Sequence, residues 1–415
     1  MTAVLTVWWG DQTVGALRID RQGDIEFAYA DSWRAASHAR AISVSLPLRA
    51  EPYLRREARP FFEGLLPEES QRIAVARALG ISQQNEFRLL EQIGGEVAGA
   101  LSLWPEGETP PAASYETPPT PLSEDALIAL LDRLPTRPLL AGEEGLRLSL
   151  AGAQAKVPLV MTGGGLALPR PGEPTTHILK PPIARFADTT ENEAFAMRLA
   201  KGIGLDTADI EIATVRDRSF LLVKRYDRKT NSEGRVQRLH QEDFCQAMGY
   251  TSAQKYAADG GPVFRDCFAL LRGAATRPAR DVLRLLDAAL FNLIIGNADA
   301  HGKNFSLLYE SDEITLAPLY DLLSTVSYPD LSPNLAMKIA RRARLEDLVT
   351  RDWAKFAEET GLSEPFIRRR AAALTDAVIA HAPAELAGFA PAVQPTMQKF
   401  ADLVAMRAAR LKDAL

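Results

Sequence analysis

An apolar segment at 279–295 that ends at a glycine constrains the fold more than any other part of the chain. Its large apolar residues recur at helical spacing: Leu283, Leu286, Leu290 and Ile294. Such a stripe predicts a helix with one buried face, and glycine, here Gly296, is a residue at which helices commonly stop. The polar run 297–304 is therefore expected to be a loop that leaves the end of a buried helix.

Two apolar runs follow this loop, at 305–309 and 314–319, and the polar residues between them predict a hairpin. The loop precedes the first strand of the hairpin and Asp321 follows the second, so both lie at its open end. We therefore expect Asp299, Asn304 and Asp321 to lie close together. The alternative is that they are ordinary loop acids and helix caps, as most Asp and Asn residues near element ends are.

The spacing of these three residues points to phosphoryl transfer. Asn304 stands five positions after Asp299, and Asp321 stands 17 positions after Asn304, which is the kind of spacing that protein kinases use. In that chemistry one carboxylate, here Asp299, orients the attacking hydroxyl and accepts its proton. An amide oxygen and a second carboxylate, here Asn304 and Asp321, hold Mg²⁺ against the phosphates.

Two further residues fit a nucleotide site. Lys180 ends the apolar run 177–180, which predicts a strand. Kinases use a strand lysine to hold the nucleotide phosphates and a helix glutamate to hold that lysine. Glu193, on the next predicted helix, is the first candidate for this glutamate and Glu191 is the second. The alternatives are a solvated strand end for Lys180 and, for Glu193, a place in the capping box that begins at Thr190.

A loop of small residues at 149–156 is predicted between two strands, 147–150 and 157–161. Small residues allow backbone N–H groups to approach an anion, and Lys156 adds positive charge. A tight hairpin is the alternative, because the full glycine pattern of a phosphate loop is absent. The end of another predicted strand, 221–228, offers backbone groups that suit an adenine ring, or is an edge strand with a charged exit.

Six arginines on predicted helices form two clusters: Arg341, Arg342 and Arg344, and Arg368, Arg369 and Arg370. They are interpreted as solvated helix faces with pairs such as Arg342 and Glu346, and contact with phosphate or nucleic acid is the alternative. The net charge of −5 does not favour nucleic acid as the main partner.

Composition and the N-terminus predict a cytoplasmic protein. The 415 residues are 47% hydrophobic and 24% charged, which is ordinary for a globular chain long enough for two or three domains. Two cysteines, Cys245 and Cys267, are too few for a disulfide framework. No run of 18 apolar residues is present, so no membrane partner is expected. Residues 1–10 lack the basic start and the cleavage site of a signal peptide.

The order of the predicted elements suggests three domains. Residues 3–30 alternate like an antiparallel meander, and the stretch 105–123, with six prolines, predicts a stiff connector. A mixed sheet with one helix is expected next, followed by a mostly helical chain. We place the domains at 1–110, 111–228 and 229–415.

Together, these segments resemble the HipA family, the serine/threonine-kinase toxins of bacterial type II toxin–antitoxin modules. The resemblance covers nearly the whole chain. Besides the N-terminal meander and the residues around Asp299 and Asp321, the segments that carry it are 61–67, 149–156, 177–180, 191–193, 241–243 and 255–262.

The resemblance implies an α+β fold that is bilobal and protein-kinase-like, with an extra N-terminal β-rich subdomain and a mostly helical C-terminal lobe. It implies an ATP- and Mg²⁺-dependent protein kinase with Asp299 as the catalytic base and Asn304 and Asp321 as metal ligands. A phosphate loop and Lys180 would hold the phosphates, and a hinge would hold the adenine. The residues implied for the ATP site are Ala151, Gly152, Ala153, Gln154, Ala155, Lys156, Lys180, Lys224, Arg225, Tyr226, His301, Gly302, Lys303, Asn304 and Tyr320.

Ser149 matches the serine that the family autophosphorylates, a modification that would eject the phosphate loop and switch the kinase off. Two positions depart from the family pattern. Ala155 stands where better-known members carry Glu, and Lys224 replaces an acidic hinge residue.

The family also implies partners. These are a small helix-turn-helix antitoxin like HipB, operator DNA bound by the complex, and an aminoacyl-tRNA synthetase whose phosphorylation would arrest translation and growth. Two other hypotheses stay open. A small-molecule kinase of the aminoglycoside or choline type also uses an Asp with an Asn five residues on, and an inactive co-repressor would only bind the antitoxin and DNA.

Overall fold

The structure is a computed structural model that describes residues 3–114 and 117–415. The chain forms two compact units. Unit 1 consists of Met1–Pro181, Ala213–Ser252 and Leu308–Glu310, and unit 2 consists of Pro182–Ile212, Ala253–Leu307 and Ser311–Leu415. Unit 1 holds most of the strands and unit 2 holds the longest helices, so the predicted α+β class is confirmed.

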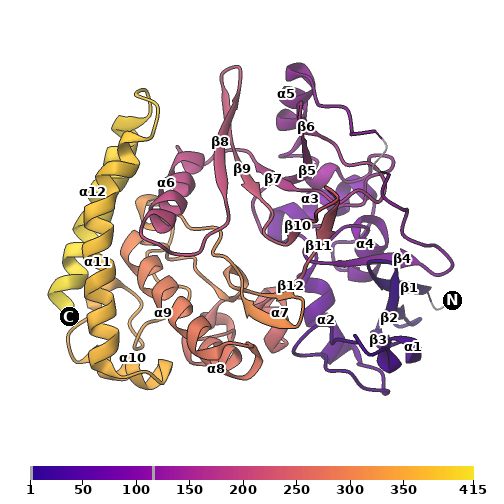
Figure 1. Ribbon diagram of the computed structural model, residues 1–415, viewed down its shortest axis with the longest axis horizontal. Coiled ribbons are helices and arrows are strands. Elements are labelled where there is room, and N and C mark those ends of the chain that lie inside the picture. Colours follow the sequence, from indigo (N-terminus) through magenta and orange to yellow (C-terminus); the bar gives the residue numbers. More distant parts are fainter. Residues whose placement is uncertain (1–2, 115–116) are drawn as a thin grey trace. The chain divides into compact units, whose positions relative to one another are not determined.

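The N-terminal meander of unit 1 forms as predicted (Figure 1). Its strands are β1 (Ala3–Trp9), β2 (Gln12–Ile19) and β3 (Ile25–Tyr29), and buried residues such as Leu5 alternate with more exposed ones. The sequence analysis missed a fourth strand, β4 (Leu101–Pro105), which pairs antiparallel with β1.

Four helices of unit 1 lie between β3 and β4 in the chain. They are α1 (Asp31–Ala35), α2 (Arg55–Gly64), α3 (Glu69–Leu79) and α4 (Glu86–Ile93). Phe61 and Phe62 of α2 share one buried apolar core with Phe27 of β3, and the ring centroids of Phe27 and Phe62 lie 5.2 Å apart. Burial of these large aromatic side chains holds α2 against the sheet.

A second sheet of unit 1 has the strand order β6-β5-β7-β9-β8. Its central strand, β7 (His177–Lys180), is antiparallel to both neighbours, and Lys180 itself pairs with Leu221 of β9. The other elements of this region are α5 (Glu124–Arg133), the 3-10 helix Pro138–Leu140, β5 (Val157–Thr162), β6 (Gly165–Ala167), β8 (Ile210–Val215) and β9 (Arg218–Lys224).

Residues 147–150 do not form the strand that was predicted. Leu148 makes a single parallel bridge to Glu96, and β5 pairs with β6 and β7 instead. The backbone N–H of Ser149 donates to the carbonyl of Glu96 at 2.8 Å, a long-range bond that a local pattern does not reveal. The loop 149–156 is therefore not the turn of a hairpin, and that alternative is wrong.

The remaining elements of unit 1 are β10 (Arg228–Thr230), β11 (Val236–Arg238), β12 (His240–Asp243) and α7 (Phe244–Met248). Arg228 of β10 and Arg238 of β11 belong to a buried ion cluster. The Glu96 carboxylate lies 3.1 Å from Arg225, 2.9 Å from Arg228 and 3.2 Å from Arg238, and Arg225 also pairs with Asp227 at 2.7 Å. Burial by itself raises the pKa of Glu96, but the three guanidinium groups outweigh this effect and lower it to about 2.

This cluster predicts a loss of stability in acid. The pKa of Glu96 is lower in the folded state than its ordinary value of 4.5, so its contribution is complete above about pH 4.5 and is lost as the pH falls towards 2. The free energy of unfolding is expected to fall by on the order of 3 kcal/mol from this residue over that range. Urea unfolding of wild type and Glu96→Gln, followed by circular dichroism between pH 6 and 3, measures it. The difference between the two proteins should shrink as the pH falls, and a difference that is constant with pH contradicts the assignment.

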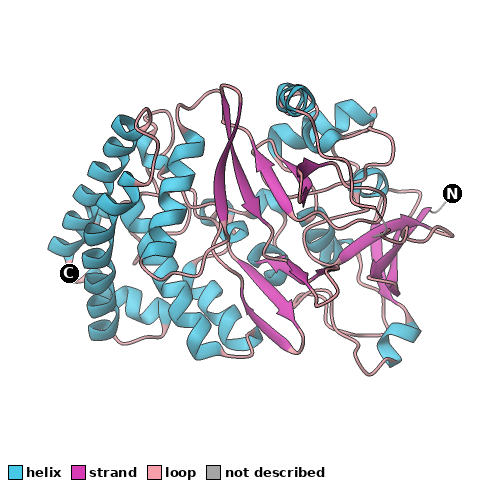
Figure 2. Ribbon diagram, turned by 45° about the horizontal axis from the view of Figure 1, so that its top comes forward, coloured by secondary structure: helices cyan, strands magenta, loops and turns pink. Residues whose placement is uncertain are grey.

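Unit 2 is mostly helical, as expected for this part of the chain (Figure 2). Helices α11 (Glu364–Ala387) and α12 (Gln394–Ala414) lie side by side, and both contact α9 (Pro278–Ile295). Its other elements are α6 (Thr189–Gly202), α8 (Phe264–Ala274), β14 (Glu313–Leu316), α10 (Asp352–Thr360) and 3-10 helices at Ala257–Asp259, Gly302–Asn304, Thr325–Ser327 and Leu345–Asp347. The 3-10 helix Ser252–Gln254 and the strands β8 and β13 (Ser306–Glu310) contain residues of both units. Among the helices of the described residues, none is long and apolar enough to cross a membrane.

Two details of the helix predictions were wrong. Leu283 of α9 is 38% exposed, because its neighbour Val282 takes the buried position at this turn; the other three residues of the predicted stripe are fully buried. The capping box that was predicted to begin at Thr190 does not form, because α6 already begins at Thr189 and has no side-chain cap hydrogen bond.

The arginine clusters also differ from the prediction. Arg342 and the two other arginines of its cluster lie outside any helix, and Arg342 pairs with Asp352 at 2.9 Å rather than with Glu346. The second cluster does lie on a helix, α11, where Arg370 forms a two-bond ion pair with Asp287 of α9 at 2.6 and 2.7 Å. Both arginines therefore serve ion pairs within unit 2.

Candidate active site

Helix α9 ends where a glycine is required. Gly296 has φ +74°, and a Cβ atom there would lie 2.3 Å from Cγ2 of Val326. The backbone therefore turns in a left-handed conformation that glycine adopts without strain. Arg407 of α12 donates to the carbonyls of Leu293 and Ile294 at 3.0 and 3.2 Å, and its charge suits the C-terminal end of a helix.

The loop after α9 is tied to the segment around 325. The N–H of Ala298 donates to Oγ1 of Thr325 at 2.8 Å, and the N–H of Val326 donates to the carbonyl of Gly296 at 3.1 Å. Asn297, which is buried, donates to the side chain of Asn292 at 2.9 Å. These bonds fix the start of the loop that carries the three predicted active-site residues.

Asp299 is exposed and receives a hydrogen bond from Tyr256. The Tyr256 hydroxyl donates to Oδ1 of Asp299 at 2.9 Å, and its ring meets the ring of His301 edge-on, with centroids 5.2 Å apart. The sequence analysis noticed Tyr256 only as part of a matching segment and gave it no role. No local signal connects it to Asp299, since 43 residues separate the two in the chain.

The two predicted metal ligands lie side by side. Nδ2 of Asn304 donates to Oδ2 of Asp321 at 3.0 Å, and Oδ1 of Asn304 accepts from the N–H of His301 at 3.1 Å. Asp321 has φ +59°, a conformation that is uncommon outside glycine and that recurs at functional sites. One carboxylate and one amide oxygen suit Mg²⁺, which takes most of its remaining ligands from water and phosphate. The described residues contain no group of three His, Cys, Asp or Glu side chains that suits a metal.

Tyr320 connects the segment before Asp321 to the loop. Its hydroxyl donates to the carbonyl of Lys303 at 2.7 Å and lies 2.7 Å from Oγ of Ser306. The side chains of His301 and Lys303 are buried, at 7% and 6% exposure. Tyr256 and His301 therefore link Asp299 to Asn304 and Asp321 in one connected set within unit 2. That these three residues share an active site stays a prediction.

The predicted lysine and its glutamate belong to different units. Lys180 lies in unit 1 at the end of β7 and is 8% exposed, which is not the solvated strand end of the alternative. Glu193 lies in unit 2 on α6 and is 4% exposed. Next to it, Asn192 is held by hydrogen bonds to and from the backbone of Ser324, at 3.0 and 2.8 Å. The pairing of Lys180 with Glu193 stays a prediction.

The predicted phosphate loop is folded on itself. Nζ of Lys156 donates to the carbonyl of Ala151 at 2.7 Å, and Nε2 of Gln154 donates to the carbonyl of Pro181 at 3.2 Å. Gly152 has φ +113°, and a Cβ atom there would lie 2.4 Å from Nζ of Lys156. Glycine thus allows the lysine to close the loop.

Ser149 is completely buried. Its side chain has 0% exposure, and its hydroxyl donates to the carbonyl of Leu65 at 2.7 Å. A phosphate group cannot reach this oxygen until the segment around it moves.

The side chains of the predicted hinge point in different directions. Lys224 is exposed, whereas Arg225 is buried in the ion cluster with Glu96. The hydroxyl of Tyr226 donates to Oε1 of Gln241. The guanidinium of Arg225 is thus occupied within unit 1, so only its backbone suits an adenine contact.

Tyr256 leads to a prediction. Tyr256→Phe removes the hydroxyl that holds Asp299 and keeps the ring against His301. The turnover rate of the predicted phosphoryl transfer is expected to fall about tenfold, since one hydrogen bond to a charged group is worth about 1.5 kcal/mol. The KM for ATP should stay unchanged. Steady-state kinetics separate the two quantities, and an unchanged rate contradicts a positioning role for this hydroxyl.

Comparison with known proteins matches both parts of the chain to one family. Residues 5–104 match the HipA N-terminal domain, and residues 148–385 match the HipA-like C-terminal domain. The protein named "Putative kinase Y4mE" from Sinorhizobium fredii is 59% identical over 375 residues, which are 90% of this chain and 89% of that protein. The serine/threonine-protein kinase toxin HipA from Shewanella oneidensis is 31% identical over 375 residues, which are 87% of this chain and 84% of that protein.

A solved structure extends the similarity to the fold. The HipA chain in a Shewanella oneidensis complex of HipA, HipB and operator DNA superposes with a TM-score of 0.86 and is 27% identical, and the match covers 99% of this chain and 100% of that one. Because both domains match and a named kinase toxin is similar over most of its length, the chain belongs to the HipA family.

Proposed function

We propose that the chain is an ATP- and Mg²⁺-dependent serine/threonine protein kinase that acts as a growth-arresting toxin. The observation that carries the proposal is the contact between Asn304 and Asp321, 3.0 Å apart, on a connected set of residues that also presents an exposed Asp299. The similarity to a protein named as a serine/threonine-protein kinase toxin supports the same activity.

In the proposed reaction Asp299 acts on a serine or threonine hydroxyl of a protein substrate. Its carboxylate accepts the proton as the hydroxyl oxygen bonds to the γ-phosphorus of ATP. The bond from that phosphorus to the bridging oxygen breaks, and ADP leaves with the electron pair. Tyr256 keeps the carboxylate oriented towards the attacking group.

Asn304 and Asp321 would hold Mg²⁺, which neutralises charge on the β- and γ-phosphates when it is bound. Lys180, oriented by Glu193, and the loop 151–156 would hold the phosphates. The other residues proposed to line the ATP site are Lys224, Arg225, Tyr226, His301, Gly302, Lys303 and Tyr320.

We propose three partners on the pattern of the family. A HipB-like helix-turn-helix antitoxin would bind the chain, and the complex would bind operator DNA. Support comes from the Shewanella oneidensis complex, which contains HipA, HipB and operator DNA. The substrate we propose is an aminoacyl-tRNA synthetase.

Expression without the antitoxin tests this function. Wild type should arrest growth of the host and add phosphate to serine or threonine of a small set of proteins, detected by phosphoproteomics. Asp299→Asn should do neither. Retained toxicity in this variant would contradict the proposal.

Autophosphorylation at Ser149 is a separate prediction. The purified protein incubated with ATP should carry one phosphate on Ser149 by mass spectrometry, and Ser149→Ala should not. The Ser149 hydroxyl is buried and hydrogen-bonded to the carbonyl of Leu65, so it must leave this site before it can react. A phosphate group carries a charge of about −1.5 to −2, so its return to the buried site would carry a large desolvation penalty. The phosphorylated protein should therefore bind ATP more weakly.

The same measurements distinguish the alternatives. A small-molecule kinase should leave Ser149 unmodified and consume ATP with an aminoglycoside or choline. Calorimetry that detects no ATP binding supports an inactive co-repressor instead.

A further inference from the structure

Residues 96–99, which we call the central segment, connect two parts of the proposed ATP site. The central segment contacts Ser149 through its backbone, and it contacts the proposed hinge, 224–226, through a side chain. All three parts belong to unit 1. The central segment lies between α4 and β4 in the chain and is largely buried: Glu96 is 5% exposed and Val97 is 0% exposed.

The backbone of Glu96 holds the chain around Ser149 in place. The N–H of Glu96 donates to the carbonyl of Arg147 at 2.8 Å, and the carbonyl of Glu96 accepts from the N–H of Ser149 at 2.8 Å. These are the two bonds of the parallel bridge between Glu96 and Leu148. Ser149 is therefore bonded to the central segment through its N–H and to Leu65 through its hydroxyl.

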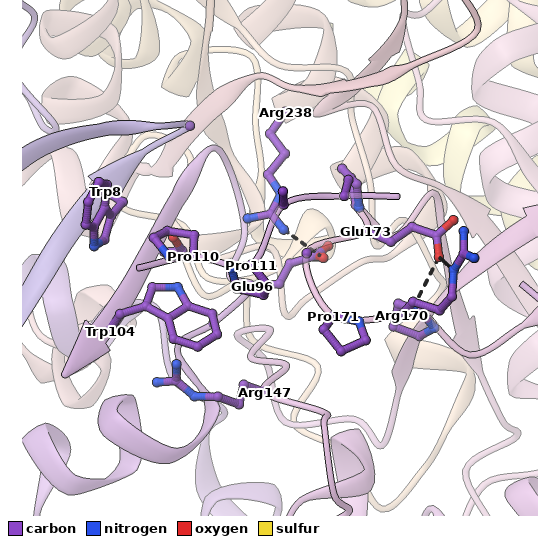
Figure 3. Close-up of a pocket in the computed structure, with 18 of the residues that line it drawn as sticks. Trp8, Glu96, Trp104, Pro110, Pro111, Arg147, Arg170, Pro171, Glu173 and Arg238 are labelled. Atoms are coloured by element: carbon purple, nitrogen blue, oxygen red, sulfur yellow. Dashed lines mark hydrogen bonds and ion pairs between the residues drawn. The ribbon is translucent and has the colours of Figure 1, made fainter. Parts of the chain in front are cut away.

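The side chain of Glu96 holds the hinge. Its Oε1 accepts from Arg225 at 3.1 Å, from Arg228 at 2.9 Å and from the hydroxyl of Thr175 at 2.5 Å. Its Oε2 pairs with Arg238 at 3.2 Å, the contact drawn between these two residues in Figure 3. Arg225 is the hinge residue of this cluster and is 3% exposed, so water does not take the place of its carboxylate partners.

The rest of the central segment contacts the residues in and after the hinge as well. Nη2 of Arg225 donates to the carbonyl of Val97 at 3.2 Å, and the N–H of Gly99 donates to Oδ2 of Asp227 at 2.7 Å. Gly99 has φ +86°, and a Cβ atom there would lie 2.8 Å from the backbone nitrogen of Gln241. Glycine thus allows the central segment to approach closely enough for these bonds.

A movement of Ser149 therefore reaches the hinge through Glu96. When the chain around Ser149 leaves its buried site, the N–H and the carbonyl of Glu96 lose their partners, and buried backbone groups are nearly always paired. The central segment must then shift to find new partners. The ion pairs of Glu96 oppose separation, because each buried charge would be left uncompensated, so Arg225 shifts with it.

We propose that Glu96 is a positioning residue that transmits the state of Ser149 to the hinge. This inference rests on the proposed function and adds a step to the regulation of the same ATP site. With Ser149 buried, Glu96 holds the hinge in place. With Ser149 phosphorylated and out of its site, the hinge loosens together with the phosphate loop, so the adenine contact weakens as well as the phosphate contacts.

Adenosine tests the proposal because it has no phosphate groups and cannot report on the phosphate loop. Calorimetric titration of the full chain compares unmodified protein, protein phosphorylated at Ser149, and Ser149→Ala, which keeps the backbone bond to Glu96. Phosphorylation should raise the Kd for adenosine about fivefold or more, the lower end of typical coupling between two sites. Ser149→Ala should bind adenosine as unmodified protein does. A Kd for adenosine that phosphorylation leaves unchanged, while ATP binds more weakly, overturns the proposal.

Hydrogen exchange followed by mass spectrometry measures the same coupling without a nucleotide or kinase activity, so it separates this inference from the proposed function. Ser149→Glu introduces a charged side chain that does not fit the buried site. It should speed exchange of the amides at 224–228 about fivefold or more, whereas Ser149→Ala should not. Strand β2, which is also in unit 1, is the reference. Equal acceleration in β2 and the hinge indicates a general loss of stability and contradicts the proposal, as does an unchanged hinge.

Two variants identify Glu96 as the connection. Glu96→Gln keeps the backbone bonds to Ser149 but loses the charge that holds Arg225, so the hinge should exchange fast and adding Ser149→Glu should have little further effect. Coupling is reciprocal, so Arg225→Lys, which keeps the charge but loses the planar fork, should speed exchange of the peptide that contains Ser149. This second variant also serves if Glu96→Gln fails to fold. Additive effects of Glu96→Gln and Ser149→Glu on the hinge, or an unchanged Ser149 peptide in Arg225→Lys, contradict the proposal.

Discussion

Replacing Asp299 with asparagine is expected to lower the rate of phosphoryl transfer by about 10²- to 10⁴-fold, the range that a positioned general base contributes. The change keeps the size of the side chain and its acceptor for Tyr256, so the loop should keep its shape. What is lost is the carboxylate that accepts the hydroxyl proton. Single-turnover phosphorylation of Ser149 or of a host protein, with γ-labelled ATP, measures the rate.

The affinity for ATP separates this explanation from a folding defect. Asp299 is not among the residues proposed to hold ATP, so calorimetry should give the same Kd for wild type and variant. Asp402→Asn is a matched control, because Asp402 is also an exposed aspartate of unit 2 that accepts one side-chain hydrogen bond, from Gln398 at 2.7 Å. A variant at Asp299 that keeps the wild-type rate rules out the proposed base.

The connected set around Asp299 could be predicted from the sequence because its signals are local. A stripe of leucines defines α9, and a glycine with a required positive φ ends it. Two apolar runs define the hairpin that follows, in which β13 and β14 are neighbouring strands. The side chains that leave the two ends of such a hairpin have little freedom to separate. The contact between Asn304 and Asp321 is the result.

Contacts between distant parts of the chain could not be predicted in this way. Strand β4 joins β1 across about 95 residues, and Tyr256 reaches Asp299 across 43. The burial of Ser149 depends on its bonds to Leu65 and Glu96, and neither residue has a sequence pattern that points to it. Residues 147–150 looked like a strand because apolar residues alternate there, but alternation does not identify the partner.

The contacts of Arg225, in the proposed ATP site, could not be predicted from the sequence either. Its place after a strand suggested a hinge residue, and the sequence gives no sign that its side chain is part of a buried ion cluster. Five charged residues of that cluster come from three separate stretches of the chain, around 96, 225–228 and 238. Only the fold brings them together. In the folded state, attraction between the opposite charges offsets the free-energy cost of removing each group from water.

Asp321→Asn is expected to remove most of the proposed dependence of phosphoryl transfer on Mg²⁺. The variant keeps an oxygen that accepts the hydrogen bond from Asn304 but loses the only carboxylate among the two proposed ligands. Mg²⁺ binds weakly to neutral oxygens alone, since it prefers one or two carboxylates together with phosphate and water. At a fixed low Mg²⁺ concentration the rate should fall about 10²- to 10³-fold, comparable to the loss of one preorganised electrostatic contact.

The decisive measurement is ATP binding with and without Mg²⁺. In wild type Mg²⁺ should tighten ATP binding, because the Asp321 carboxylate would hold the ion and its charge would attract the phosphates. In Asp321→Asn the two titrations should give nearly the same Kd, whereas Asp299→Asn should respond to Mg²⁺ as wild type does. The contrast between the two variants distinguishes the metal ligand from the base. A folding defect is distinguished as well, because it would weaken ATP binding both with and without Mg²⁺. If Asp321→Asn keeps the wild-type response to Mg²⁺, then Asp321 is not a metal ligand and its left-handed backbone needs another explanation.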